Sequence, residues 1–77
     1  MYKIKEEKIK EIKDGRTLTI LAEILGIHIS YLSMIFCRKR ACSGLIAKGL
    51  ISIKKNTSLN DDRMEEYLEY YFTREEE

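Results

Sequence analysis

Few side chains in this sequence are suited to covalent or metal chemistry. The candidates are the only histidine, His28, and the two cysteines, Cys37 and Cys42. They lie nine and five residues apart, which matches no zinc knuckle, and a structural zinc site normally takes four ligands. A Cys–His nucleophile pair needs an orienting third group and a pocket, for which 77 residues offer little room. We therefore predict no catalytic residue, no metal and no cofactor, and we interpret the cysteines as small hydrophobic side chains.

Positive charge is the other chemical feature, and it is unevenly distributed. Residues 1–60 carry twelve basic and five acidic side chains, whereas residues 61–77 carry two basic and eight acidic ones. No Asp or Glu occurs from Ile24 to Asn60, where the basic residues are Arg38, Lys39, Arg40, Lys48, Lys54 and Lys55. Such a segment attracts polyanions. The charge pattern alone is also compatible with an ordinary solvated lysine face.

Length and composition predict one globular domain over residues 1–77. Hydrophobic residues make up 44% and charged residues 35% of the chain, unlike the core-poor pattern of disordered proteins. The absence of proline and the presence of only four glycines favour helices joined by short turns. Two cysteines without a secretory leader suit a reducing compartment, and the most apolar segment, 41–53, is shorter than the roughly 20 residues of a membrane span. We expect a soluble, cytoplasmic protein.

Hydrophobic periodicity predicts five helices and no strand longer than a few residues. The first helix should cover residues 3–14, where three isoleucines form a narrow apolar stripe, and end at Gly15. Thr17 should cap a second helix over 18–25, which is apolar on most sides and is therefore expected at the centre of the fold.

Two more predicted helices follow a turn at Gly26. One runs from about residue 28 or 29 to Cys37, and the next is capped by Ser43 and ends near Ile51. The turn between them is the basic run 38–40.

An acidic C-terminal helix is predicted at about residues 60–73. Ser58 to Asp62 supply a cap and N-terminal acids, and the apolar face consists of Met64, Tyr67, Leu68 and Tyr71. Tyr70 and Phe72 fall outside that face. If exposed, they indicate a dimer or partner interface, and the alternative is packing against the first helix. The acidic residues 75–77 are expected to fray.

The most informative segment is Leu18 to Phe36, with the sequence LTILAEILGIHISYLSMIF. Two helices that cross steeply need a small residue at the crossing, here Ala22, and a residue tolerant of positive φ in the turn, here Gly26. They also need apolar contacts from both sides, which are Leu21, Leu25, Ile27, Leu32 and Ile35.

From about Thr17 to Ile51 the sequence resembles the lambda-repressor and Cro family of helix-turn-helix domains. The resemblance implies an all-α, five-helix lambda-repressor-like bundle, with the helix-turn-helix at about residues 17–37 and its second helix in the major groove of DNA. The run 38–40 and Ser43 look like the family's basic turn and following cap. The sequence departs from the pattern at three positions: Phe36 replaces a common Glu, Arg38 a usual Gly and Cys42 a frequent Pro.

Candidate site residues follow from this arrangement. A nine-residue helix is about 14 Å long and suits a major groove about 12 Å wide. The predicted base-reading residues point away from Leu32 and Ile35: His28, Ile29, Ser30, Ser33, Met34 and Cys37. The predicted phosphate contacts are Thr17, Thr19, Arg38, Lys39, Arg40 and Ser43. The reading face has no Arg, Lys, Asn or Gln, which leaves hydroxyl, imidazole and thymine-methyl contacts together with DNA shape.

The sequence supports three functions, none of them enzymatic. We expect sequence-specific binding to duplex DNA by a small Cro-like transcriptional regulator of bacterial or phage type, such as a repressor. A homodimer on DNA is expected, because one short recognition helix without bidentate side chains gives little affinity. The alternatives are an antitoxin whose acidic C-terminal helix holds a toxin, and a helix-turn-helix scaffold that binds a protein partner through Ile29, Met34 and Phe36.

Overall fold

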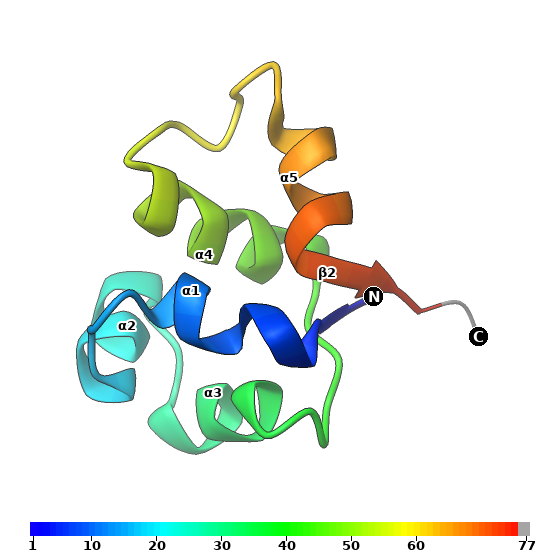
Figure 1. Ribbon diagram of the computed structural model, residues 1–77. Helices are drawn as coiled ribbons and strands as arrows, with labels where there is room; N and C mark the ends of the chain where they lie inside the picture. The colour runs from blue at the N-terminus through cyan, green and yellow to red at the C-terminus, as the bar shows by residue number, and fades with distance from the viewer. Residues whose placement is uncertain (76–77) are drawn as a thin grey trace.

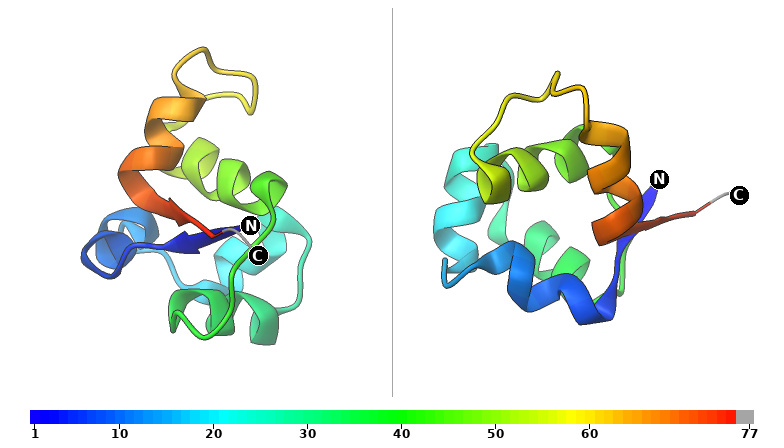
Figure 2. Two further views of the ribbon diagram at one scale, coloured as in Figure 1. Left: turned by 90° about the vertical axis from the view of Figure 1, so that its right-hand side faces the viewer. Right: turned by 45° about the horizontal axis from the view of Figure 1, so that its top comes forward.

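The computed structural model describes residues 1–75 and is mostly helical, with one small sheet (Figure 1). The elements in chain order are strand β1 (Tyr2–Ile4), the 3-10 turn η1 (Glu6–Lys8), the helices α1 (Ile9–Lys13), α2 (Leu18–Leu25), α3 (Ile29–Phe36), α4 (Gly44–Lys55) and α5 (Met64–Tyr71), and strand β2 (Phe72–Arg74). Helix α4 crosses the middle of the molecule, with α3 at one end and α5 at the other (Figures 1 and 2). None of the helices in residues 1–75 is by itself long and apolar enough to cross a membrane.

Helix α4 contributes four buried residues, Ala47, Gly49, Leu50 and Ile51. The other α-helices and both strands add apolar side chains to the same core cluster. The side chains with at most 2% exposure are Ile4, Ile12, Leu21, Leu32, Ile35, Cys42, Ala47, Leu50, Ile51, Leu68, Tyr71 and Phe72.

The predicted start and end signals of the middle helices are confirmed. The Thr17 hydroxyl accepts a hydrogen bond from the Ile20 amide at 3.2 Å, and the Ser43 hydroxyl accepts one from the Ile46 amide at 3.3 Å. Gly26 ends α2 in the left-handed conformation, with φ +70°. Helix α4 continues to Lys55, beyond the predicted end near residue 51.

The prediction of one helix over residues 3–14 is wrong at its beginning. Residues 2–4 form β1, which pairs antiparallel with β2 so that Ile4 lies opposite Phe72. The Tyr2 amide also donates to the Cys42 carbonyl at 2.8 Å, and the Cys42 amide returns a bond of 2.7 Å. Because both partners of β1 lie far away in the sequence, the isoleucine stripe gave no sign of them.

The C-terminal helix is also shorter than predicted. It begins at Met64 and not near residue 60, because Asp61 instead holds a turn. The Asp61 carboxylate accepts hydrogen bonds from the Thr57 hydroxyl and from the Arg63 amide, and these bonds lower its pKa. At the other end the chain leaves the helix for β2, where Phe72 is buried against the expectation of an exposed aromatic residue. The Glu75 amide bonds to the Met1 carbonyl at 2.8 Å, and residues 76–77 of the predicted frayed tail lie outside the described residues.

Helix α2 is less central than its composition predicts. Leu21 and Ala22 are buried, but Ile20 is 46% and Ile24 is 58% exposed. One apolar face of α2 therefore lies open on the surface.

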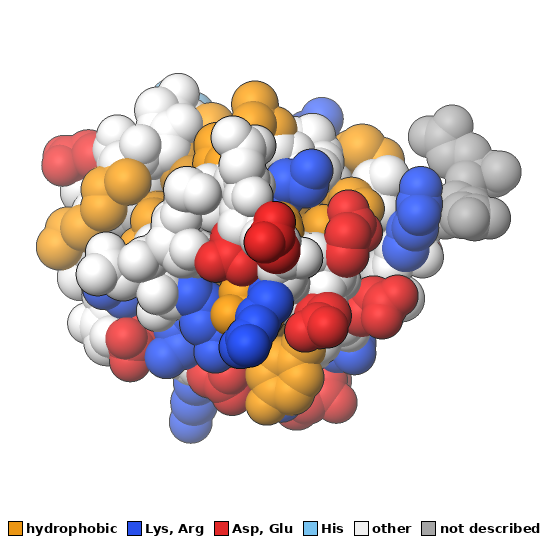
Figure 3. All heavy atoms as spheres, turned by 90° about the horizontal axis from the view of Figure 1, so that it is seen from above, with side chains coloured by type: hydrophobic (Ala, Val, Ile, Leu, Met, Phe, Trp, Pro, Cys, Tyr) orange, Lys and Arg blue, Asp and Glu red, His pale blue; other side chains and the backbone are white. Residues whose placement is uncertain are grey.

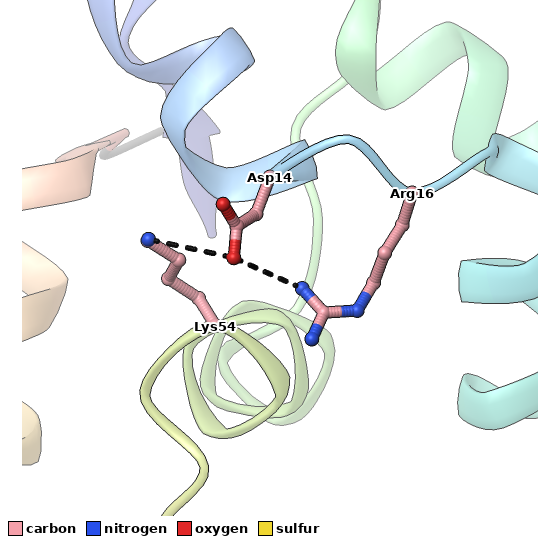
Figure 4. A network of polar contacts seen from close by, with 3 residues as sticks. All are labelled: Asp14, Arg16 and Lys54. Carbon is pink, nitrogen blue, oxygen red and sulfur yellow. Dashed lines mark hydrogen bonds and ion pairs between the residues drawn. The ribbon is translucent and has the colours of Figure 1, made fainter.

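A small ionic network ties the α1–α2 turn to the end of α4 (Figure 4). Asp14, which ends α1 with φ +49°, lies 3.4 Å from an Arg16 guanidinium nitrogen and 3.7 Å from the Lys54 ammonium. All three side chains reach solvent, so each pair contributes at most about 1 kcal/mol to stability.

Candidate nucleic-acid interface

Helices α2 and α3 form a steep, tightly joined pair. Each has eight residues, three residues separate them, and the chain direction turns by 117° between their axes. The Ile27 amide closes the turn by bonding to the Ala22 carbonyl at 3.1 Å. Leu21 of α2 and Leu32 and Ile35 of α3 are completely buried, so the inner faces of both helices belong to the core.

The outer face of α3 carries the side chains that the sequence selected as base readers. Ile29 and Met34 are 41% and 40% exposed. The remaining predicted readers are the exposed His28, Ser30 and Cys37 and the half-buried Ser33. The structure therefore places four of the predicted residues on α3 itself and the other two, His28 and Cys37, at its N-cap and C-cap.

His28 also has a local structural role at the start of α3. Its Nδ1 accepts a hydrogen bond from the Ser30 amide at 3.1 Å, which makes it the N-cap. A neutral imidazole that accepts through Nδ1 carries its proton on Nε2. The exposed ring of His28 therefore keeps its Nε2–H as a donor.

The basic turn after α3 divides into one structural cation and two exposed ones. Arg38 adopts φ +61°, and its Nε donates to the carbonyl of Ile4 at 2.9 Å. The Nε of Arg38 is thus engaged in holding β1, so the phosphate contact predicted from the sequence would use its two terminal nitrogens. Lys39 and Arg40 are exposed, and the Arg40 guanidinium lies 5.1 Å from the ring centroid of the half-buried Tyr31.

A basic depression lies at the start of α2. Its volume is about 600 Å³, and it is lined by Lys10, Lys13, Gly15, Arg16, Thr17 and Leu18. The unpaired amides and the dipole at a helix N-terminus favour anions, and cations around it add to that preference. Thr17 uses its oxygen as the cap acceptor but keeps a hydroxyl proton to donate, and Thr19 is exposed next to it.

Sequence reasoning selected the two threonines but missed the cations of this depression, Lys10, Lys13 and Arg16. A signal was present, because basic residues directly preceding a capped helix lie close to its N-terminus. Ser43, also predicted as a phosphate contact, is half-buried and caps α4.

Acidic side chains lie at the opposite end of the molecule from α3. The exposed acids Asp62, Glu65, Glu66 and Glu69 belong to α5 and the segment before it. Figure 3 looks onto that end and shows acidic side chains over part of it, with basic side chains among them. A polyanion that approaches α3 therefore meets the end of the molecule remote from this acidic surface (Figures 1 and 2).

The two cysteines have different environments. Cys37 is exposed, whereas Cys42 is buried, and this burial raises the pKa of its thiol to about 11. The interpretation as packed hydrophobic side chains therefore holds for Cys42 and not for Cys37. Within residues 1–75, no group of three His, Cys, Asp or Glu side chains is placed to hold a metal ion.

Of the two aromatic residues predicted at a dimer or partner interface, only Tyr70 is exposed, at 49%. The Lys8 ammonium lies 3.7 Å from its ring centroid, so a cation covers part of this aromatic surface. Comparison with family models, with curated proteins and with solved structures finds no match for this chain.

Proposed function

We propose that this protein binds duplex DNA as a small Cro-like transcriptional regulator of bacterial or phage type, with α2 and α3 acting as a helix-turn-helix. The observation that carries the proposal is the exposed outer face of α3, which follows a 117° turn and precedes two exposed cations. Helix-turn-helix pairs cross at about 90–120° through a turn of three or four residues. Eight residues make a helix about 12 Å long, which suits a major groove about 12 Å wide.

In this proposal the outer face of α3 reads base edges. The hydroxyls of Ser30 and Ser33 and the Nε2–H of His28 bond to base or phosphate oxygens, and Ile29 and Met34 contact thymine methyl groups. Because none of these contacts is bidentate, each base pair contributes modest discrimination, and DNA shape adds to it.

Phosphate contacts come from both ends of the two-helix unit. Lys39 and Arg40 extend from the turn after α3, and the depression at the start of α2 contributes helix amides together with Lys13 and Arg16. Two regions of contact fix the orientation of α3 on the duplex without adding sequence information.

The salt dependence of binding tests this proposal. Fluorescence anisotropy with a labelled duplex should give a slope of log K against log salt of about −3 to −5, as expected for three to five phosphate contacts. Lys39→Ala combined with Arg40→Ala should make the slope shallower by about 2 for all sequences. The matched control is Arg63→Ala, which removes an exposed cation at the acidic end and should leave the slope unchanged. A flat salt response would refute the proposal.

The exposure of Ile29 and Met34 favours a protein partner as the second candidate function, since apolar side chains on a recognition helix also suit a protein groove. Phe36, expected to belong to that surface, is only 7% exposed and does not contribute to it. Absence of any enriched sequence after selection from a random duplex pool, together with a flat salt response, would favour this function over DNA binding.

We further propose that DNA is bound by a homodimer. One α3 without bidentate contacts provides little affinity, and two copies about 34 Å apart would read two half-sites.

A further inference from the structure

An apolar groove lies between α2, α4 and the loop that precedes α5. Its volume is about 500 Å³, and none of the ten residues that line it is charged. Gly49 on α4 allows the Leu25 side chain of α2 to lie against the α4 backbone, since a Cβ at Gly49 would come within 2.6 Å of Leu25 Cδ2. This contact forms the floor of the groove.

Large apolar side chains are unusually exposed around this floor. Leu45 is 69%, Ile24 is 58% and Leu59 is 41% exposed. Together with the half-buried apolar residues of the lining they form an apolar patch, and the largest such patch on a monomer is often functional.

A homodimer needs an apolar surface at the centre of its interface. A standard interface buries about 800 Å² per partner, and homodimer interfaces are about 65% apolar. The groove with its three strongly exposed apolar side chains can form the centre of such an interface.

We propose that a second copy of this chain docks on the α2–α4 groove around a two-fold axis, with Leu45 of each copy packed into the groove of the other. In a two-fold interface the same surface meets itself, so a charged patch would oppose its own copy. The lining here is uncharged and brings no like charges together. This inference deepens the proposed homodimer by naming its surface. It differs from the aromatic pair expected from sequence, of which Phe72 is buried and Tyr70 is 49% exposed beside Lys8.

The position of the groove is compatible with DNA binding by both copies. Ile27, which lines the groove, directly precedes the cap of α3, and Ser43 at the other side of the lining caps α4. None of the predicted base-reading residues belongs to the lining, so the groove and the outer face of α3 are separate surfaces. Strand β2 and the described end of the chain lie on the far side of the molecule from α2 (Figures 1 and 2).

Sedimentation equilibrium of the full chain without DNA tests the proposal. The wild type should move from the 9.1 kDa monomer to a dimer as its concentration rises. Leu45→Glu places two carboxylates in the symmetric interface and should raise the dimer dissociation constant by about 100-fold or more, and Leu45→Ala should raise it less. Because Leu45 is largely exposed in the monomer, both variants should keep the helical circular dichroism of the wild type.

The matched control is Tyr70→Glu, which changes an exposed aromatic residue of α5 outside the groove and should leave the dimer intact. A wild type that stays monomeric at all concentrations would overturn the proposal, as would a dimer that survives Leu45→Glu or is lost in Tyr70→Glu. Since DNA is absent, a failure here leaves the proposed DNA binding standing. If the protein dimerises as expected but does not bind DNA, the proposed dimer surface stands and the proposed function fails.

Discussion

Replacing Arg38 separates a structural role from a DNA-binding role for the first cation after α3. Its Nε bond of 2.9 Å reaches the carbonyl of Ile4, a residue with 0% exposure. A hydrogen bond from a charged donor contributes about 1.5–3 kcal/mol, and a buried carbonyl left without its partner has a similar cost. Arg38→Ala should therefore lower the free energy of unfolding by about 2 kcal/mol.

The backbone of Arg38 gives this prediction a second, independent part. With φ +61° the residue is left-handed, which costs a residue with a Cβ about 1–2 kcal/mol and glycine almost nothing. Arg38→Gly loses the same hydrogen bond but relieves this strain. Its free energy of unfolding should thus lie between those of the wild type and Arg38→Ala, about 1 kcal/mol below that of the wild type.

Thermal unfolding followed by circular dichroism measures both effects. For a domain of this size 1 kcal/mol corresponds to about 4–8 °C in Tm, so Arg38→Ala should lose about 8–16 °C and Arg38→Gly about half of that. Below its Tm, Arg38→Ala should keep the salt slope of DNA binding, whereas Lys39→Ala should make it shallower by about 1. An Arg38→Ala protein as stable as the wild type, or an Arg38→Gly protein no more stable than Arg38→Ala, would refute the reasoning.

Four further predictions concern the core and the thiols. Within residues 1–75 the buried Tyr71 hydroxyl makes no hydrogen bond of normal geometry, and its burial, together with the nearby Glu11 carboxylate, raises its pKa. Tyr71→Phe removes this poorly satisfied hydroxyl and should raise the free energy of unfolding in a urea titration by about 1 kcal/mol, whereas a loss would show a stabilising hydrogen bond between Tyr71 and Glu11. Iodoacetamide should label Cys37 in the folded protein and Cys42 only after unfolding, which mass spectrometry of the peptides would show. Because the pKa of Cys42 is raised to about 11 from its usual 9.0, its thiol favours the folded state below pH 9, and this contribution should decrease as the pH rises toward 11; a Cys42→Ala protein should lose less stability over that range. Leu32→Ala removes a completely buried leucine and should cost about 2–5 kcal/mol, enough to unfold much of the protein in a thermal melt, and a variant as stable as the wild type would place Leu32 outside the core.

The features that sequence predicted correctly depend on residues close together in the chain. Thr17 and Ser43 bond to amides three residues further on, and Gly26 ends a helix through its own backbone. The outer face of α3 follows from the helical period once Leu32 and Ile35 are assigned to the core.

The features that sequence missed depend on distant partners. Phe72 is buried because it pairs with Ile4, and no local pattern links residues so far apart. The role of Arg38 depends on the same strand, since its acceptor is the Ile4 carbonyl.

The sequence analysis also missed two surfaces, because each of them forms only where two helices pack against each other. The basic depression forms where the end of α1 meets the start of α2, and the apolar groove forms where α2 crosses α4. Ile24 is a residue type typical of a protein core, yet the way α2 packs on α4 leaves its side chain 58% exposed.

The most direct test of the central claim is selection of bound sequences from a random duplex pool by the wild type and by Ser30→Ala. We expect the wild type to enrich one sequence pattern, and Ser30→Ala to change the preference at one base pair by about 1–3 kcal/mol while its thermal melt stays that of the wild type. Tyr70→Ala, which changes an exposed residue of α5, should enrich the wild-type pattern. If the wild type enriches no pattern, or if Ser30, Ser33 and Met34 can all be replaced without changing it, the outer face of α3 does not read DNA.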